Sequence, residues 1–98
     1  ITAATIGAKY TFFVGTDASD LDIKTDGTDK FVGSVSVAGT TTKAFAPAAS
    51  NDVISMNGST TGGDAGSYVE ATALATAEYL VQGVLVGSGS VSTPFADS

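Results

Sequence analysis

Hydrophobic and polar residues alternate in short runs along much of the chain, and this spacing of two is typical of β-strands with one buried face. From Ala8 to Gly15, the side chains of Tyr10, Phe12 and Val14 fall on one face, which we expect to be buried. Further strands are predicted at Leu21–Thr25, Lys30–Gly39, Thr40–Ala46 and Asp52–Asn57. The side chains predicted to face inward from them include Phe31, Val35, Val37, Ile54 and Met56. Because Pro47 has no backbone donor, Thr40–Ala46 is placed at a sheet edge.

The longest run without a strong turn signal is Gly66–Gly87, and it predicts a hairpin of two strands, Ser67–Ala73 and Ala77–Val86. The alternative is a helix over residues 68–82, which contain many good helix formers and no Pro or Gly. The bulky apolar residues form no stripe at helical spacing, and Gly83 follows, so the hairpin is favoured. Its turn, Leu74–Thr76, lacks the Gly, Asn or Asp of a usual tight turn.

Turn signals separate the predicted strands, most clearly at Asp26-Gly27 and Asn57-Gly58. The segment Gly58–Gly66 contains four glycines and no bulky side chain, which indicates a linker or an exposed loop. This spacing predicts an all-β fold: a single-domain antiparallel β-sandwich or barrel of about six to seven short strands with extended terminal arms. We divide the domain, residues 1–98, into an N-terminal arm (1–7), a β core (8–87) and a C-terminal arm (88–98).

The chain has ten acidic residues and four lysines, with no Arg, His or Cys, and its net charge is −6. A chain without Arg is poorly suited to grip phosphate, so nucleic acid is not an expected partner. The absence of Cys excludes disulfides and thiolate metal sites, and no apolar run approaches the length of about 20 residues that a membrane span needs. No signal-peptide pattern is seen in Ile1–Gly7, and the start at Ile1 rather than Met indicates a processed or partial chain.

The missing residue types also exclude Ser–His, Cys–His and His-ligated metal sites, so we expect no enzyme, no catalytic residues and no cofactor. The remaining candidate is a cluster of aspartates. Its members are Asp17, Asp20, Asp22, Asp26 and Asp29. Counted as an EF-hand loop from Asp20, the cluster has Lys24 at the fifth position and Thr25 where glycine is required. Turn-forming aspartates on solvated loops are the plainer interpretation, and no metal site is predicted.

Several segments together resemble a family of small β-rich virion proteins of tailed bacteriophages. The resemblance is carried by Tyr10–Thr16 (YTFFVGT), Ile23–Gly27 (IKTDG), Gly33–Gly39 (GSVSVAG), Asn51–Gly58 (NDVISMNG), Gly63–Glu70 (GDAGSYVE) and Tyr79–Gly83 (YLVQG). It covers most of the chain, and each piece is a strand with its turn. Proteins of this kind are typically capsid decoration or cement subunits on the outside of the shell.

The resemblance implies a structural protein of the virion, located on the capsid surface, with the major capsid protein as its partner. Self-association is also expected, because a small core and open sheet edges favour symmetric assembly. The resemblance implies a homotrimer, since decoration proteins commonly sit at the three-fold positions of a capsid. An acidic, β-rich chain with few lysines equally suits a secreted bacterial surface or adhesin-like module. The resemblance also leaves open an accessory protein of the phage neck or tail. A sugar-binding module is a third hypothesis, which the absence of Trp disfavours.

Contact with the larger assembly is predicted for the two terminal arms, which carry only Asp97 as a charged residue. Such arms can add as strands to an exposed sheet edge of a partner. The predicted partner-binding residues are Ile6, Val91, Pro94 and Phe95. Among them Phe95 is the largest, and Pro94 favours an extended approach. The alternative is that Phe95 folds back on its own core.

Overall fold

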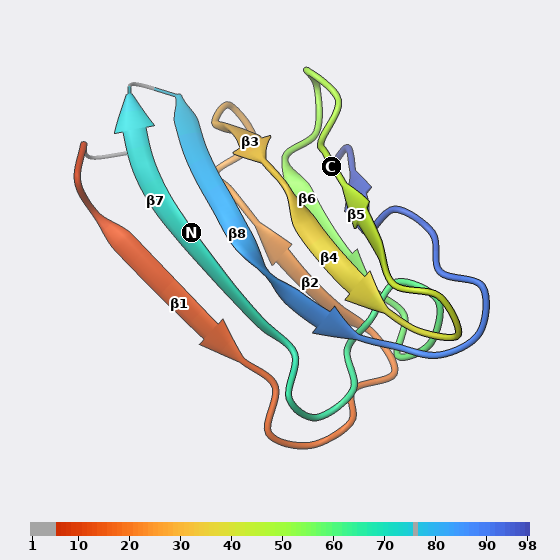
Figure 1. Cartoon of the computed structure of the whole chain (residues 1–98). Coiled ribbons are helices and arrows are strands. Elements are labelled where there is room, and N and C mark those ends of the chain that lie inside the picture. Colours follow the sequence, from red (N-terminus) through yellow and green to blue (C-terminus); the bar gives the residue numbers. More distant parts are fainter. Residues whose placement is uncertain (1–5, 76) are drawn as a thin grey trace.

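A computed structural model of the chain describes residues 6–75 and 77–98. These residues form strands and connecting loops, with no helix among them (Figure 1). The strands are β1 (Lys9–Phe13), β2 (Leu21–Lys24), β3 (Lys30–Gly33), β4 (Val35–Ala38), β5 (Lys43–Phe45), β6 (Val53–Met56), β7 (Tyr68–Ala75), β8 (Glu78–Val86) and β9 (Phe95–Ala96). The all-β prediction is confirmed, although the described strands are shorter and more numerous than expected.

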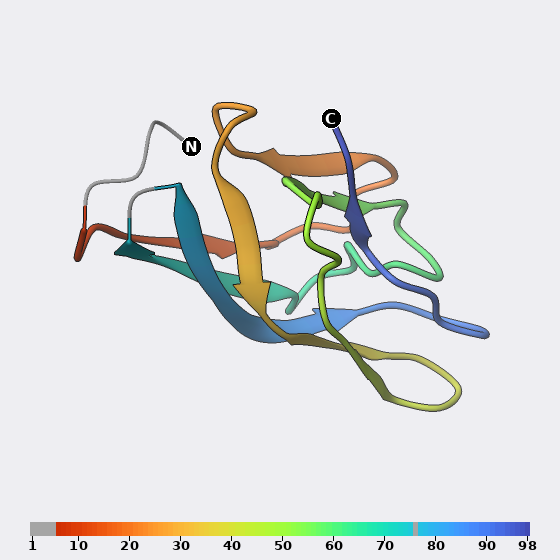
Figure 2. The same ribbon diagram turned by 90° about the horizontal axis from the view of Figure 1, so that it is seen from above.

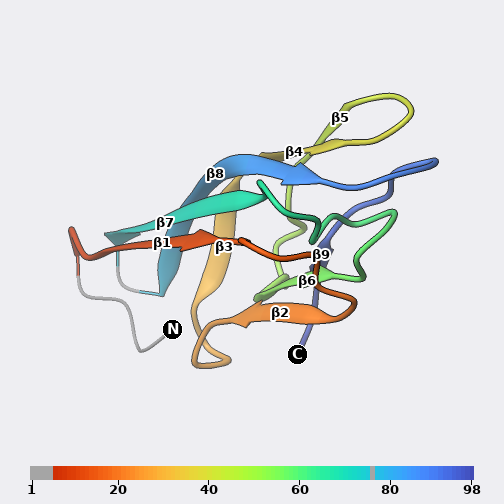
Figure 3. The same ribbon diagram turned by 90° about the horizontal axis from the view of Figure 1, so that it is seen from below.

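The strands form two sheets that pack face to face as a β-sandwich (Figures 2 and 3). The large sheet has the order β1-β7-β8-β4-β5, with β3 also paired to β8, and the small sheet has the order β2-β6-β9. The prediction of a purely antiparallel sandwich was wrong in one respect. Both β3 and β4 pair with β8 in parallel, because the chain crosses to the small sheet as β6 before it returns.

The hairpin predicted within Gly66–Gly87 is confirmed, and the helical alternative is excluded, since β7 and β8 pair antiparallel over their length. The register shifts between Ala73 and Ala75, just before the turn. At the turn, Ala77 has a φ of 65°, a left-handed conformation that costs a residue with a Cβ atom about 1 kcal/mol or more. Thr76 lies outside the described residues. The hairpin therefore forms without a favourable turn sequence, through its long paired strands.

The predicted strand Lys30–Gly39 is divided into β3 and β4 by Gly33, which has a φ of 98°. A side chain at Gly33 would lie 2.5 Å from the carbonyl oxygen of Val81, so the close approach to β8 requires glycine. The interruption lets β3 follow the first half of β8 and β4 the second half, where β8 bends across the sheet (Figure 1).

The core lies between the sheets and contains the residues that the alternation placed inside. Phe31, Val35, Val37, Ile54 and Met56 are all buried, as predicted. The expected inner face of β1 is only half-buried, because β1 lies at the edge of the large sheet. Tyr79 is fully buried, with its ring 6.2 Å from that of Tyr10, and burial raises its pKa.

Gly58–Gly66 is not a loose linker but a folded loop held by backbone hydrogen bonds at several points. Gly58 N–H donates to Gly62 O at 2.7 Å, and Asp64 N–H donates to Val86 O at 3.0 Å. Gly62 and Gly63 are buried, and a side chain at Gly62 would meet the Cβ atom of Leu85. The glycines of this loop permit close packing. A high glycine content is equally compatible with a flexible segment, so the sequence alone did not reveal the packing.

The C-terminal segment also differs from the predicted extended arm. Its last strand, β9, pairs antiparallel with β6, and the ring of Phe95 lies 6.3 Å from that of Phe31. The end of the segment is fixed by Asp52, whose side chain accepts hydrogen bonds from the backbone N–H and the hydroxyl of Ser98, both at 2.7 Å. Residues 88–98 are therefore part of the sandwich in this structure.

Candidate binding surfaces

The outer face of the large sheet, on the side away from the small sheet, carries an aromatic pair. Phe13 on β1 is directly opposite Tyr68 on β7, and the ring centroids lie 6.4 Å apart. Phe13 is 78% exposed and Tyr68 is 42% exposed. The register of β7 and β8 extends this row to Val84, which is half-buried. No described segment lies over this part of the sheet in Figures 2 and 3, so the rings face solvent.

Polar and apolar side chains form two further rows beside the aromatic pair. The middle row is Thr11, Glu70 and Gln82, and the next is Lys9, Thr72 and Leu80. Gln82 Nε2 donates to Glu70 Oε1 at 3.1 Å, and Lys9 Nζ lies 3.4 Å from the same oxygen. The charges in these rows are thus paired with each other. We refer to these three rows as the outer face.

Acidic charge is concentrated away from the outer face. The strands of the large sheet contain three lysines and two glutamates, Glu70 and Glu78. All eight aspartates and the remaining lysine, Lys24, belong to the small sheet, the loops and the flanks of strands. The strands of the large sheet therefore carry a net charge of +1, and the rest of the chain carries −7. Large exposed apolar side chains and low net charge thus coincide on the outer face.

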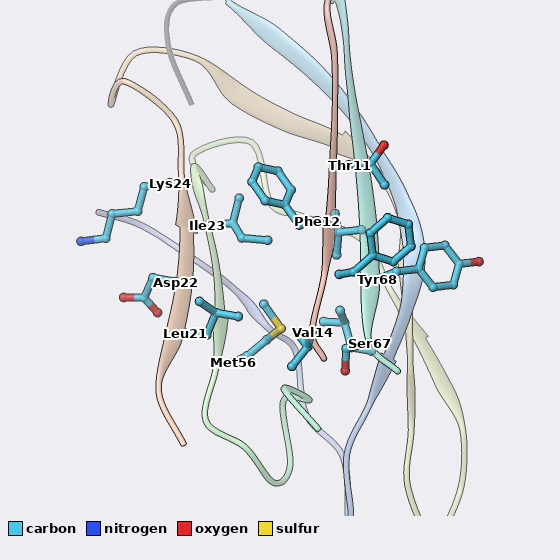
Figure 4. Close-up of a pocket in the computed structure, with 13 residues that line it drawn as sticks. Thr11, Phe12, Val14, Leu21, Asp22, Ile23, Lys24, Met56, Ser67 and Tyr68 are labelled. Carbon is cyan, nitrogen blue, oxygen red and sulfur yellow. The ribbon is translucent and has the colours of Figure 1, made fainter. Parts of the chain in front are cut away.

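A second feature is a groove of about 500 Å³ at the open side of the sandwich, between β1 and β2. Figure 4 shows Phe12 and Val14 of β1 facing Ile23 and Leu21 of β2 across this space, while Tyr68 points away to the outer face. Met56 and Leu85 also line the groove. Because β1 and β2 are each the end strand of their sheet, the groove is an unclosed edge of the hydrophobic core.

The four residues predicted to bind a partner lie in different surroundings. Val91, Pro94 and Phe95 are buried in the chain's own core, with Phe95 only 6% exposed. Their burial agrees with the alternative interpretation, that Phe95 folds back on its own core, and makes the three side chains inaccessible to a partner in this fold. Ile6 is 70% exposed, and its role in binding stays a prediction. Residues 1–5 of the predicted N-terminal arm lie outside the described residues.

Two aspartates of the predicted turns, Asp26 and Asp17, accept hydrogen bonds from backbone N–H groups. Asp26 Oδ1 accepts hydrogen bonds from the backbone N–H groups of Asp29 and Thr28, both at 3.0 Å, and these bonds hold its pKa below the usual value. Asp17 Oδ1 accepts from Ala65 N–H at 2.8 Å and so joins two loops. In the described part of the chain, no group of three or more acidic residues is arranged to hold a metal ion.

Asp52, which is buried like Asp29, links the start of β6 to Ser98, which follows β9. Its pKa is lowered first by the hydrogen bond from the Ser98 hydroxyl, with further contributions from the Ser98 backbone N–H and from Lys30. Lys30 Nζ lies 3.7 Å from Asp52 Oδ2. Burial acts in the opposite direction, but the hydrogen bonds prevail. The Asp52 carboxylate therefore stabilises the fold, since its partners, Ser98 and Lys30, belong to the chain itself.

The chain matches no protein-family model, no curated protein and no solved structure. Among residues 6–75 and 77–98 there is no helix that could cross a membrane. The alternation of Ala8–Gly15 leaves Phe13 on the face opposite Tyr10, Phe12 and Val14, but Phe13 was not among the predicted contact residues. An aromatic residue between Thr11 and Gly15 on that face was the available signal, while its partner Tyr68 emerges only from the strand register.

Proposed function

We propose that the chain is a structural protein of a tailed-bacteriophage virion, a decoration or cement subunit that binds the outside of the capsid shell. Its partner is the major capsid protein, and the outer face of the large sheet is the contact surface. The family is proposed from the resemblance of the strand and turn segments described above. Homotrimer formation stays a prediction alongside it.

The observation that carries the assignment of the contact surface is the uneven distribution of charge and apolar area. Phe13 and Tyr68 lie on a face whose few charges are paired, whereas the aspartates lie elsewhere. Exposed aromatic side chains are enriched at the centres of protein interfaces, where charged residues are depleted. A subunit of a shell needs one surface that binds and another that stays solvated, and the proposal assigns these roles to the outer face and to the aspartate-bearing loops.

Binding to empty shells tests the proposal. The probe is the purified chain, added to DNA-free shells of the phage whose genome carries its gene, and co-sedimentation is measured. We expect Phe13→Asp to abolish binding, because it places an unpaired charge within the contact surface. Thr41→Asp, on the exposed loop between β4 and β5, adds the same charge elsewhere and should leave binding unchanged. Equal binding by both variants would contradict the assigned surface.

The location of the protein separates this function from that of a bacterial surface module. Mass spectrometry of particles purified by density gradient should detect the chain in stoichiometric amounts, and its gene should lie beside those of a major capsid protein and a portal. Recovery of the chain in the cell-envelope fraction, with none in the particles, would favour the adhesin-like alternative.

A further inference from the structure

We infer that two copies of this chain pair through β1, whose outer edge joins the same edge of a second copy in antiparallel orientation, about a two-fold axis at Thr11. The two large sheets then form one continuous sheet, with both outer faces on the same side. This contact forms between free chains, so it does not depend on the proposed function.

The outer edge of β1 presents the backbone groups of alternate residues. Just after the strand, Val14 N–H donates to Ser67 O at 2.9 Å, so the even-numbered positions bond to the neighbouring chain segment of β7. In an antiparallel pair the bonding direction alternates, which directs the N–H and C=O groups of Lys9, Thr11 and Phe13 to the outer edge. Since β1 ends the large sheet, no strand of the described chain pairs along this edge.

Among the described strands that end a sheet, β1 is the least protected against a further strand. Short length and charged side chains are common protections of sheet edges. β9 has two residues, β5 has three and begins with Lys43, and β2 carries Asp22 and Lys24. By contrast, β1 has five residues and a single charged residue, Lys9, at its first position. Pairing is therefore expected at β1 before the other edges.

A two-fold axis at Thr11 gives a register in which no like charges are opposed. Thr11 lies opposite Thr11 of the second copy, and Lys9 lies opposite Phe13, so that each pair exchanges both of its backbone hydrogen bonds. The aliphatic part of Lys9 then lies beside the ring of Phe13 from the second copy, while its ammonium group stays near Glu70. The rows of the outer face thus continue from one copy to the other.

The inner face of the same register covers the groove between β1 and β2. Tyr10 lies opposite Phe12 of the second copy, and aromatic pairs across antiparallel strands are stabilising. The groove, of about 500 Å³, opens beside β1. Because a two-fold contact brings the same surface of both copies together, the two grooves face each other and their apolar linings are shielded from water.

The charge distribution favours a second copy as the occupant of this edge. The chain has ten acidic residues and a net charge of −6, so most surfaces of two copies repel each other. No acidic residue lies in β1, and the strands of the large sheet carry a net charge of +1. Two copies can therefore approach edge to edge at β1 without bringing acidic side chains together.

Size-exclusion chromatography with light scattering tests the pairing. The unchanged chain should have twice the mass of one chain. Thr11→Pro removes the N–H group that faces the second copy but no bond to β7, and proline is tolerated at such edge positions, so this variant should be a monomer with an unchanged circular dichroism spectrum. Thr11→Val keeps the N–H group and should stay paired. An unchanged chain that is monomeric or trimeric, or equal pairing by Thr11→Pro and Thr11→Val, would overturn the inference.

Cysteine cross-linking tests the register, and the chain has no native cysteine. Thr11 is exposed, and its Cα atoms in the two copies would lie about 5.5 Å apart, within the range for a disulfide. Thr11→Cys should therefore oxidise to a linked dimer. Lys9→Cys, also exposed on β1, is the control and should link far more slowly, because its two copies would lie about 13 Å apart or more. Linkage of Thr11→Cys no faster than that of Lys9→Cys would overturn the inference, whether or not Thr11→Pro folds.

Discussion

Replacement of Phe95 by alanine distinguishes a C-terminal segment folded on its own sheet from a free arm. Phe95 is 6% exposed, its ring lies 6.3 Å from that of Phe31, and β9 pairs with β6 beside it. Removal of a buried phenyl ring typically lowers the free energy of unfolding by about 3 to 5 kcal/mol. For a domain of this size, about 3 kcal/mol corresponds to a fall in melting temperature of about 12 to 24 °C. This is a large part of the total stability of about 5 to 15 kcal/mol typical of small domains.

The assay is urea and thermal unfolding followed by far-ultraviolet circular dichroism, with Phe13→Ala as the matched control. The two substitutions remove the same atoms, but Phe13 is 78% exposed and its replacement should change the free energy of unfolding by less than about 0.5 kcal/mol. The slope of the free energy of unfolding against urea concentration is compared between the two variants. Equal slopes would show that their unfolded states are comparable. If Phe95→Ala were as mild as Phe13→Ala, the segment would be an arm and the packing described for β9 would be refuted.

Three further predictions concern the loop, the buried carboxylate and the hairpin turn. Gly62→Ala should lower the free energy of unfolding by about 2 to 4 kcal/mol, because Gly62 has a φ of 90° and a Cβ atom there would lie 2.5 Å from that of Leu85. Gly27→Ala is the control, because Gly27 has a φ of 98° but open space around it, and it should lower the free energy of unfolding clearly less. If both variants lost the same free energy of unfolding in chemical denaturation, the loop would not pack on Leu85. Because the pKa of Asp52 is lowered in the folded chain, its ionised carboxylate stabilises the fold. This stabilisation is fully present above the ordinary pKa of an aspartate, about 3.9, and is lost as the pH falls through the lowered pKa of the folded chain. Asp52→Asn should therefore be less stable than the unchanged chain at pH 7, and its melting temperature should fall less between pH 7 and pH 2. The same fall in melting temperature in both chains would contradict the stabilising role of the Asp52 carboxylate. Ala77→Gly should raise the free energy of unfolding by up to about 1 kcal/mol, because glycine relieves the left-handed conformation at a φ of 65° but costs entropy, whereas any loss of stability would argue against that turn geometry.

Local patterns along the chain were sufficient to predict most strands and their inward faces. Val35 and Val37, both buried, lie two positions apart on β4, and this period of two follows directly from the geometry of a strand. The β7–β8 hairpin was favoured for a similar reason, despite its poor turn sequence. What the alternation could not predict was the parallel pairing of β3 and β4 with β8, since a pattern within one strand contains no information about its partner.

The loop and the C-terminal segment were misjudged because both lack bulk and hydrophobic alternation. The buried Gly62 is defined by its contact with Leu85, more than twenty residues away, and Phe95 by its contact with Phe31. Such long-range contacts decide whether a glycine or an isolated aromatic residue is buried or exposed. The candidate surface was partly visible in the sequence as Phe13, but its pairing with Tyr68 required the strand register.

Oxidative footprinting of the aromatic pair tests most directly whether the outer face contacts the shell. Hydroxyl radicals label accessible aromatic side chains, and mass spectrometry measures the extent of oxidation at Phe13 and Tyr68 in the free chain and in assembled particles. We predict that both residues are oxidised in the free chain, where they are 78% and 42% exposed, and are protected severalfold on the particle. Equal oxidation of Phe13 and Tyr68 in the free chain and on the particle would contradict the proposed contact surface.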